Sequence, residues 1–346
     1  MSVSSTPRVA VHAPSTWRDP ASHFEVALTD PWYRMLLQLT DLMQRSTVQF
    51  WTGRGVRAAY LPVTTGSISS PMGLGSDSTP VKIELEGVPT YLADSMQFLL
   101  EYGCRMHEAG TYYVMPSFRG EAPDPTHLCQ FYHSEAEVAG GLDDVMATVE
   151  DYVRHLARDF LDEMEDVIAE VAGGTDHLRR VLELRGPFPR ITFADAVAEL
   201  GDGPDVVQQS APGIRSLTRA AERQLMDRFG EFVWVTHFDH LSVPFYQAFE
   251  PGDPSVARAG DLLFGIGETV GAGERHATAE RVREALAMHE VDEQDYAWYT
   301  RMRELRPMQT SGFGLGVERF FLWLLRHDDI RDMQMLQRVN GRQINP

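Results

Sequence analysis

The chain has 346 residues, with 31 basic and 50 acidic side chains and a formal net charge of −19. A surface this acidic repels phosphate backbones, which argues against a DNA-binding protein and against extensive RNA binding. No apolar run approaches the roughly 20 residues of a membrane helix and the N-terminus has no signal-peptide pattern, so we expect a cytoplasmic protein without a membrane partner.

Two residue types are scarce. Lys82 is the only lysine, and the pattern GxxxxGK[ST] does not occur, so a catalytic lysine and a P-loop nucleotide site are nearly excluded. Cys104 and Cys129 are too few for a disulfide framework or a zinc site, and we expect them to be reduced thiols in the core.

The first third of the chain predicts an arm followed by mixed structure. Residues 1–30 are rich in proline and serine and are expected to form a loosely ordered arm, before one folded domain over residues 31–346. Apolar residues at helical spacing predict helices over residues 30–51 and 93–109. Between them, residues 57–90 predict short strands joined by a mobile loop.

The rest of the chain alternates strands and helices. GTYYVMPSFRGE and HLCQFYHSEAEV predict an antiparallel hairpin, and residues 142–173 predict a long acidic helix. Short helices and loops are expected over 174–230. Strands are expected in EFVWVTHF and VPFYQAFE, a bent strand pair in DLLFGIGETVGAGERH, and helices near 278–290 and 293–305. The fold class that this order predicts is α+β, an antiparallel sheet flanked by helices.

SGFGLGVERF, residues 311–320, indicates a nucleotide site of another kind. Gly312, Gly314 and Gly316 alternate along a predicted strand, where a flat ring could lie against the backbone. Arg319 follows at the start of a helix, and Arg119 ends a strand of the hairpin. Two guanidinium groups suit an oligophosphate.

Further side chains complete such a site. Glu121, two residues beyond Arg119, would lie on the same face, and Phe131 could stack on the ring. His127 could donate to a phosphate, and Glu268 could hold Mg²⁺. Each signal alone has an ordinary structural explanation, a surface ion pair for RxE or a bulge for the glycine strand. The combination, in this order, predicts ATP and Mg²⁺ as the cofactors.

These motifs resemble the three signature motifs of the class II aminoacyl-tRNA synthetases, and within them the aspartyl- and asparaginyl-tRNA synthetases. AYLPVTT, with Pro62, resembles motif 1, SFRGEAPDPTHLCQFYHSEAEV resembles motif 2 and SGFGLGVERF resembles motif 3. The resemblance runs from about residue 32 to the end. It implies the class II fold, a homodimer with Pro62 and the first helix at its interface, and a small amino acid or a related compound as substrate.

The resemblance also implies a role for each matching residue. At the nucleotide, Arg119 would hold the α-phosphate, Arg319 the γ-phosphate and His127 the outer phosphates, while Phe131, Gly314 and Gly316 would enclose adenine. Glu121 would read the adenine amino group or assist the metal. Glu268 and Asp261 would hold Mg²⁺, and Gln97 and Arg275 would contact the amino acid.

The sequence departs from the subgroup mainly in the amino-acid pocket. Asp94 replaces a glutamine, Leu100 a lysine, Val243 a lysine and Gly273 a serine. Asp94 could bind an α-ammonium group or simply cap a helix. Ser76, Asp77 and His240 are further candidates for the pocket. The subgroup's N-terminal anticodon domain is expected to be missing, since only residues 1–30 precede the matching region.

Three functions remain open from the sequence. The first is an adenylating ligase that passes an aspartyl or asparaginyl group to a non-tRNA nucleophile, most simply ammonia, as in synthetase-related asparagine synthetase. The second is a tailoring enzyme for a peptide or natural-product intermediate, including dehydration of an amide to a nitrile. The third is a truncated asparaginyl-tRNA synthetase or a non-catalytic regulatory paralog. Binding of tRNA is expected to be absent.

Overall fold

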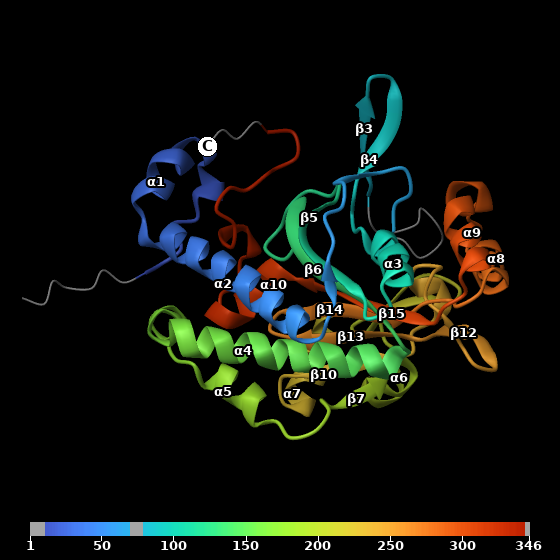
Figure 1. Ribbon diagram of the computed structural model, residues 1–346. Coiled ribbons are helices and arrows are strands. Elements are labelled where there is room, and N and C mark those ends of the chain that lie inside the picture. Colours follow the sequence, from blue (N-terminus) through green and yellow to red (C-terminus); the bar gives the residue numbers. More distant parts are fainter. Residues whose placement is uncertain (1–10, 70–78, 343–346) are drawn as a thin grey trace, which may run out of the picture.

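The computed structural model describes residues 11–69 and 79–342, and its central feature is an eight-stranded sheet. The strand order is β1-β5-β6-β15-β14-β13-β10-β7 (Figure 1). The edge pairs β1–β5 and β7–β10 are parallel, and the pairs between them are antiparallel. The predicted α+β class is confirmed.

The strands of this sheet are β1 (Arg57–Ala58), β5 (Thr111–Phe118), β6 (Gln130–Ala139), β7 (Arg190–Thr192), β10 (Val233–Thr236), β13 (Ala259–Phe264), β14 (Gly267–Glu274) and β15 (Thr310–Gly316). Smaller sheets hold β2 (Thr64–Thr65), β3 (Val81–Leu85) and β4 (Val88–Leu92), then β8 (Val207–Ala211) and β9 (Ile214–Leu217), then β11 (Phe249–Glu250) and β12 (Asp253–Ala257).

The helices are α1 (His23–Thr29), α2 (Pro31–Gly53), α3 (Gln97–Met106), α4 (Leu142–Ala172), α5 (Asp176–Glu183), α6 (Phe193–Leu200), α7 (Arg219–Phe229), α8 (Ala279–Met288), α9 (Ala297–Leu305) and α10 (Val317–Leu325). Short 3₁₀ turns lie at residues 16–18, 20–22, 240–242, 293–296 and 330–332. None of the helices in the described ranges combines the length and the apolar character needed to span a bilayer.

Helices α2 and α4 lie side by side against one face of the sheet (Figure 1). Trp51 of α2 and Tyr152 of α4 are fully buried there, with ring centroids 6.0 and 5.9 Å from that of Phe313 in β15. Successive residues of a strand point to opposite faces, so Phe313 facing the helices turns Gly312 and Gly314 toward the other face. The apolar layer thereby fixes which face of the sheet carries the glycines.

Most predicted elements are confirmed. The helix predicted for residues 30–51 is α2, which begins where the Asp30 side chain accepts the backbone N–H of Trp32 at 2.8 Å. The hairpin is β5–β6, the long helix is α4, and the glycine strand β15 runs directly into α10. The loop expected near residues 66–79 lies mostly outside the described residues.

Three expectations were wrong. Residues 11–30 are not loosely ordered, because Trp17 donates to Asp332 at 3.0 Å and Thr16 lies 2.9 Å from the His23 ring nitrogen. VPFYQAFE is mainly a loop in which neighbouring Phe245 and Tyr246 are both buried, so the two-residue alternation of a strand is lost. Residues 174–230 contain strands β7, β8 and β9 besides the expected helices.

A buried charge cluster beside the sheet yields a stability prediction. Glu101 is fully buried and accepts hydrogen bonds from Arg303 and Tyr299, both at 2.5 Å, with Arg105 at 3.7 Å. Glu101→Gln leaves two buried guanidinium groups without a counter-charge, so we expect the free energy of unfolding to fall by about 3–5 kcal/mol. Urea denaturation measures it.

The matched control is Glu163→Gln, which removes the same charge from an exposed pair with Arg45. Exposed ion pairs contribute little. If both variants lost the same free energy of unfolding, the prediction that the buried cluster contributes more than an exposed ion pair would be wrong.

Candidate active site

Two rows of residues across the sheet form the floor of the site. In the first row, Asp261 pairs with Gly271, Gly271 with Gly314, and Gly314 with Glu135. Directly paired residues point to the same face of a sheet. The two central glycines therefore leave a hollow between the Asp261 and Glu135 side chains.

The second row runs from Ala259 through Gly273 and Gly312 to Glu137. A Cβ atom on Gly312 would lie 1.9 Å from Glu137 Oε2, so only glycine allows that carboxylate to fold over the strand. The predicted ring-binding role of Gly312 is thus wrong. Gly314 and Gly316 line a cavity, whereas Gly312 makes room for a side chain.

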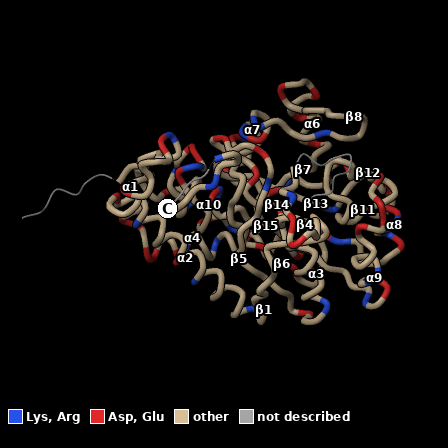
Figure 2. Tube along the Cα trace, turned by 90° about the horizontal axis from the view of Figure 1, so that it is seen from above, with Lys and Arg blue, Asp and Glu red and all other residues tan. Residues whose placement is uncertain are grey.

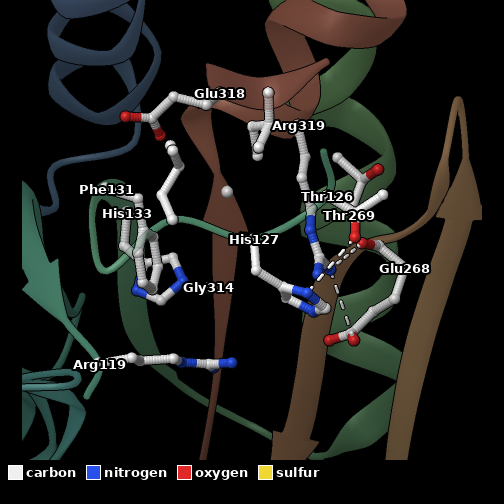
Figure 3. Close-up of a pocket in the computed structure, with 13 residues that line it drawn as sticks. Arg119, Thr126, His127, Phe131, His133, Glu268, Thr269, Gly314, Glu318 and Arg319 are labelled. Atoms are coloured by element: carbon white, nitrogen blue, oxygen red, sulfur yellow. Dashed lines mark hydrogen bonds and ion pairs between the residues drawn. The ribbon is translucent and has the colours of Figure 1, made fainter. Parts of the chain in front are cut away.

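This cavity collects the residues predicted for the nucleotide. Arg119, His127, Phe131, Gly314, Gly316 and Arg319 all line it, together with Glu268 (Figure 3). The Phe131 ring packs edge-on against His133, with centroids 4.8 Å apart. The arrangement offers an aromatic face beside bare strand backbone, as a purine requires.

Arg119 is the cation of this cavity that lacks a counter-ion. Among the described residues it forms no ion pair, and its Nε atom is buried without a hydrogen-bond partner. Its guanidinium carbon lies 5.5 Å from the Phe131 ring centroid, within cation–π range. A buried N–H group without an acceptor is costly, and an anion such as a phosphate would satisfy it.

Glu121 does not share this environment. It lines neither cavity beside Arg119, and its side chain accepts the backbone N–H of Thr79. The prediction that Arg119 and Glu121 share one face assumed that both lie in a strand, but β5 ends at Phe118, before both residues. Its other oxygen, Oε2, is buried without a hydrogen-bond partner in the described part of the chain.

The two predicted metal ligands lie together. A Cβ atom on Gly271 would lie 3.2 Å from Glu268 Oε1 and 3.6 Å from Asp261 Oδ1, so both carboxylates flank this glycine. Burial and the neighbouring charges of Glu268 and Glu222 raise the pKa of Asp261 well above its ordinary value. Burial and Glu268 likewise raise the pKa of Glu222 to about 7.

This acidic group fits a divalent cation in part. No three metal-binding side chains of the described ranges are arranged to enclose an ion by themselves. Mg²⁺ at nucleotide sites usually takes one or two carboxylates and completes its shell with phosphate oxygens and water. Glu268 and Asp261 suit that use, and repulsion among the carboxylates favours a bound cation.

Arg319 connects this acidic group to the nucleotide cavity. Its Nη1 donates to the backbone oxygen of Glu268 and lies 3.6 Å from Glu268 Oε2. His127, at the other wall, is 3.1 Å from Asp124 and 3.3 Å from Arg219 Nη2. Arg219 begins α7 and was not predicted, because nothing in its sequence neighbourhood marks it.

A second pocket of about 370 Å³ adjoins the first and shares Arg119, Gly314 and Arg319 with it. The predicted residues Asp94, Gln97 and Arg275 line it. The structure thus brings the predicted amino-acid side and the predicted nucleotide side into contact.

Hydrogen bonds within the protein fix these side chains. Ser95 accepts the backbone N–H of Gln97 at 3.0 Å and so helps to start α3, which directs Gln97 toward Glu137 at 2.5 Å. Asp94 accepts from the Ser69 backbone and hydroxyl at 3.1 and 2.9 Å.

Arg275 lines the second pocket beside Glu137, the last residue of the second row. Its Nε lies 3.3 Å from Glu137 and its Nη1 donates to Gln247 Oε1 at 2.8 Å. Burial raises the pKa of Glu137 to about 7 although Arg275 opposes the shift.

Sequence reasoning missed several lining residues. His133 and Glu135 lie on the glycine face of β6 and pair at 3.1 Å. Burial alone would raise the pKa of Glu135, but His133 and hydrogen bonds from Ser95 and Tyr113 lower it overall. Their two-residue spacing with Glu137 in HSEAE was the available signal. Tyr246 and Gln247 were missed because their segment was predicted as a strand.

His240, Ser76 and Asp77 have different outcomes. His240 is fully buried and does not line the pocket, although its partner His289 does. His240 instead contacts two residues that line the pocket. Its Nδ1 lies 2.9 Å from His289 Nε2, and its Nε2 donates to the Gln247 backbone oxygen at 2.8 Å. Ser76 and Asp77 lie outside the described residues.

Comparison with known proteins agrees with this geometry. Residues 27–340 match the family model of class II tRNA synthetases (D, K and N). The asparagine–tRNA ligase of Koribacter versatilis is 26% identical over 86% of this chain, and the probable cytoplasmic asparagine–tRNA ligase of Encephalitozoon cuniculi is 32% identical over 77%. The matches cover 66% and 59% of those relatives, so the chain spans less than two thirds of their length.

Solved structures give the same result. The asparaginyl-tRNA synthetase of Pyrococcus horikoshii, complexed with asparaginyl-adenylate, superposes with a TM-score of 0.83 at 25% identity, covering 94% of this chain and 73% of that one. The Entamoeba histolytica asparaginyl-tRNA synthetase, also with asparaginyl-adenylate, gives 0.81 at 25% identity and covers 96% and 72%.

The buried histidines predict a pH effect on stability. Burial lowers the pKa of His240 and of His289 to about 4, below the usual value near 6.5. Between these values the unfolded chain binds more protons, so stability is lost as the pH falls from 6.5 toward 4. His289→Gln keeps a donor near His240 and removes one titrating group, so the slope should decrease by up to about 1.4 kcal/mol per pH unit.

Urea denaturation at several pH values measures the slope. His12→Gln, at an exposed histidine, is the control and should leave the slope as it is. Identical slopes for the wild type and His289→Gln would contradict the prediction.

Proposed function

The chain belongs to the class II tRNA synthetases of the D, K and N type, and from this membership we propose that it is an AMP-forming, ATP-dependent ligase for aspartate, asparagine or a relative. Members of this family are adenylate-forming enzymes. The observation that carries the proposal is the Arg119 guanidinium, which lies beside Phe131, has its Nε atom buried without a hydrogen-bond partner, and has no acid partner among the described residues. Such a group is suited to a phosphate of ATP.

The first step joins the two pockets. A substrate carboxylate oxygen attacks the α-phosphorus of ATP, the bond to the β-phosphate oxygen breaks, and pyrophosphate leaves from an acyl-adenylate. The attacking group is already an anion, so no general base is required. Catalysis then consists of positioning and charge neutralisation.

Each part of the ATP molecule would be bound by a different group of residues. Arg119 would hold the α-phosphate, at the junction of both pockets. Phe131, Gly314 and Gly316 would enclose adenine, and Arg319 and His127 would hold the outer phosphates. Glu268 and Asp261 would hold Mg²⁺, which neutralises phosphate charge when bound. Glu121, which lines neither pocket, would act through the loop at Thr79.

The pocket of about 370 Å³ would hold the amino acid. Asp94 could receive the α-ammonium group, and Gln97 and Arg275 the polar groups of the side chain. Ser76 is proposed from the sequence alone. Carboxylates such as Asp94 and Glu135 also favour a cationic or ammonium-derived partner in this pocket.

For the second step we propose ammonia as the acceptor, giving the amide and AMP. The net charge of −19 disfavours a long phosphate backbone. In the view of Figure 2, basic residues are scattered among acidic ones and do not gather into one stretch. A tRNA acceptor is the second candidate, because the relatives found are asparagine–tRNA ligases.

An acceptor assay tests this proposal. The protein is incubated with Mg·ATP and aspartate or asparagine, and AMP and pyrophosphate are measured with ammonium, with tRNA, or with neither. We expect AMP release that depends on aspartate and rises with ammonium. AMP release that requires tRNA would favour the second candidate, and no turnover under any condition would contradict a ligase.

Arg119→Gln provides the matched inactive variant. Loss of one charge-stabilising donor should lower the rate of AMP formation by about 10²–10³-fold. Arg45→Gln, on the exposed side of α2, should leave it unchanged. If the two variants behaved alike, Arg119 would have no role at the phosphate.

We also propose a homodimer. Apolar side chains are exposed along α2, the segment after β1 and α3, namely Leu37, Val48, Tyr60, Tyr102 and Met106, with Tyr60 fully exposed at 102%. Pro62 lies in the same segment. Apolar exposure of this kind marks protein interfaces.

Light scattering should therefore give twice the chain mass of 38.9 kDa. The double variant Leu37→Glu with Tyr60→Glu should shift the mass to that of one chain, since it places charges in an apolar contact. A wild-type protein that is monomeric at micromolar concentration would contradict the prediction.

A further inference from the structure

The Gln247 side chain occupies space that the sheet leaves open only because residue 273 is glycine. A Cβ atom on Gly273 would lie 2.0 Å from Gln247 Oε1 and 2.7 Å from its Cδ. Gly273 has no positive φ, so the backbone itself does not demand glycine there. The two residues are therefore coupled by packing: glycine at position 273 leaves the space that the Gln247 carboxamide occupies.

The orientation of this carboxamide is set by chemistry. Gln247 Oε1 accepts from Arg275 Nη1 at 2.8 Å, and a guanidinium group can only donate. The Nε2 group must therefore face away from that contact. Gln247 is 8% exposed and lines the amino-acid pocket, so its rotation is restricted.

The backbone beneath it is also fixed. His240 donates to the Gln247 carbonyl at 2.8 Å, and Gln247 forms an isolated bridge with Arg275. Arg275 is held in turn by Glu137 at 3.3 Å and lies over the Tyr246 ring at 5.1 Å. Both side chains are thus pre-positioned before any ligand arrives.

Two donor groups remain for a ligand. In the described part of the chain, Gln247 Nε2 and Arg275 Nη2 have no hydrogen-bond partner, and neither is among the fully enclosed atoms that lack one. Both residues line the same pocket. The two groups carry N–H hydrogens and no lone pair that could accept, so they suit a group with acceptor oxygens only.

We propose that Gln247 is the specificity-determining residue of this pocket: with Arg275 it presents donors only, and so selects the free carboxylate of aspartate over the carboxamide of asparagine. The proposal rests on the proposed function in taking this cavity as the amino-acid pocket. A carboxylate satisfies both donors. A carboxamide has one acceptor oxygen for the two donors, so the donors must share that oxygen, or one of them meets the N–H₂ group or stays unpaired, which a site built for hydrogen bonding disfavours.

The decisive variant is Gln247→Glu, which has the same shape but exchanges the Nε2 donor for an acceptor. Binding of aspartate and of asparagine is measured by calorimetry in the presence of Mg²⁺ and α,β-methylene-ATP, which prevents turnover. We expect the wild type to prefer aspartate by at least about tenfold. Gln247→Glu should reverse the order, since its carboxylate repels that of aspartate and accepts from an amide.

Two further variants separate this role from folding. Gln247→Met removes the donor without adding charge, and should weaken aspartate binding without strengthening asparagine binding. Gly273→Ser leaves Gln247 in the chain but displaces its carboxamide, and should have the same effect. Gln209→Glu, at an exposed position of β8, makes the same change of charge elsewhere and should leave the preference unaltered.

The outcomes are distinct from those of the acceptor assay. Selective binding of aspartate without any AMP formation would contradict the ligase proposal and would still support this inference. An active ligase with the same aspartate-to-asparagine ratio in the wild type and Gln247→Glu would overturn the inference alone. A wild-type preference for asparagine, or no binding of either amino acid, would also overturn it.

Discussion

The site depends on four glycines that stand side by side in the middle of a buried sheet. Gly271 pairs with Gly314 and Gly273 with Gly312, so two adjacent strands lack side chains on one face. Larger residues would fill this face and close the pocket, since Cβ atoms at Gly273 and Gly312 would lie 2.0 and 1.9 Å from side chains that now occupy the space. Phe313, between the glycines of β15, packs on the opposite face with Trp51 and Tyr152. The helix layer therefore stabilises a sheet whose other face is kept open for a ligand.

Electrostatics divides this open face into two environments. On the amino-acid side, Arg275 is paired with Glu137 and Gln247, and the buried charges nearly cancel. On the predicted phosphate side, Arg119 has no acid partner in the described part of the chain, while burial and the charge of Glu268 raise the pKa of Asp261 and of Glu222. Buried groups left without partners destabilise a fold unless a ligand satisfies them. The crowded carboxyl groups on the predicted phosphate side thus lower the stability of the unliganded protein, whereas the predicted amino-acid side is arranged in advance by internal pairs.

The sequence predicted what depends on local pattern. The glycine strand, the helix at residues 30–51 and the RxE hairpin each follow from neighbouring residues, and the motif order picked out residues that line one cavity, including Phe131 and Arg319. What depends on strand register could not be predicted. That Gly312 faces Glu137, and that Glu121 turns toward Thr79, follow from where β5 and β15 end and pair. VPFYQAFE has the β-branched and aromatic content of a strand, but its turn at Pro244, where Gln247 N donates at 3.1 Å, directs Gln247 inward.

Gly273 and Gln247 show how such a pocket can change its preference while its floor stays intact. The resemblance implies a serine at position 273, and a Cβ there would collide with the Gln247 carboxamide. A change at either position alone would therefore leave a clash or an empty space, whereas both together exchange one polar group for another beside Arg275. The neighbouring row, Asp261 to Glu135, contains neither residue. The separation of the two rows would allow the proposed amino-acid pocket to differ from that of the family while the residues proposed for ATP remain those of the family motifs.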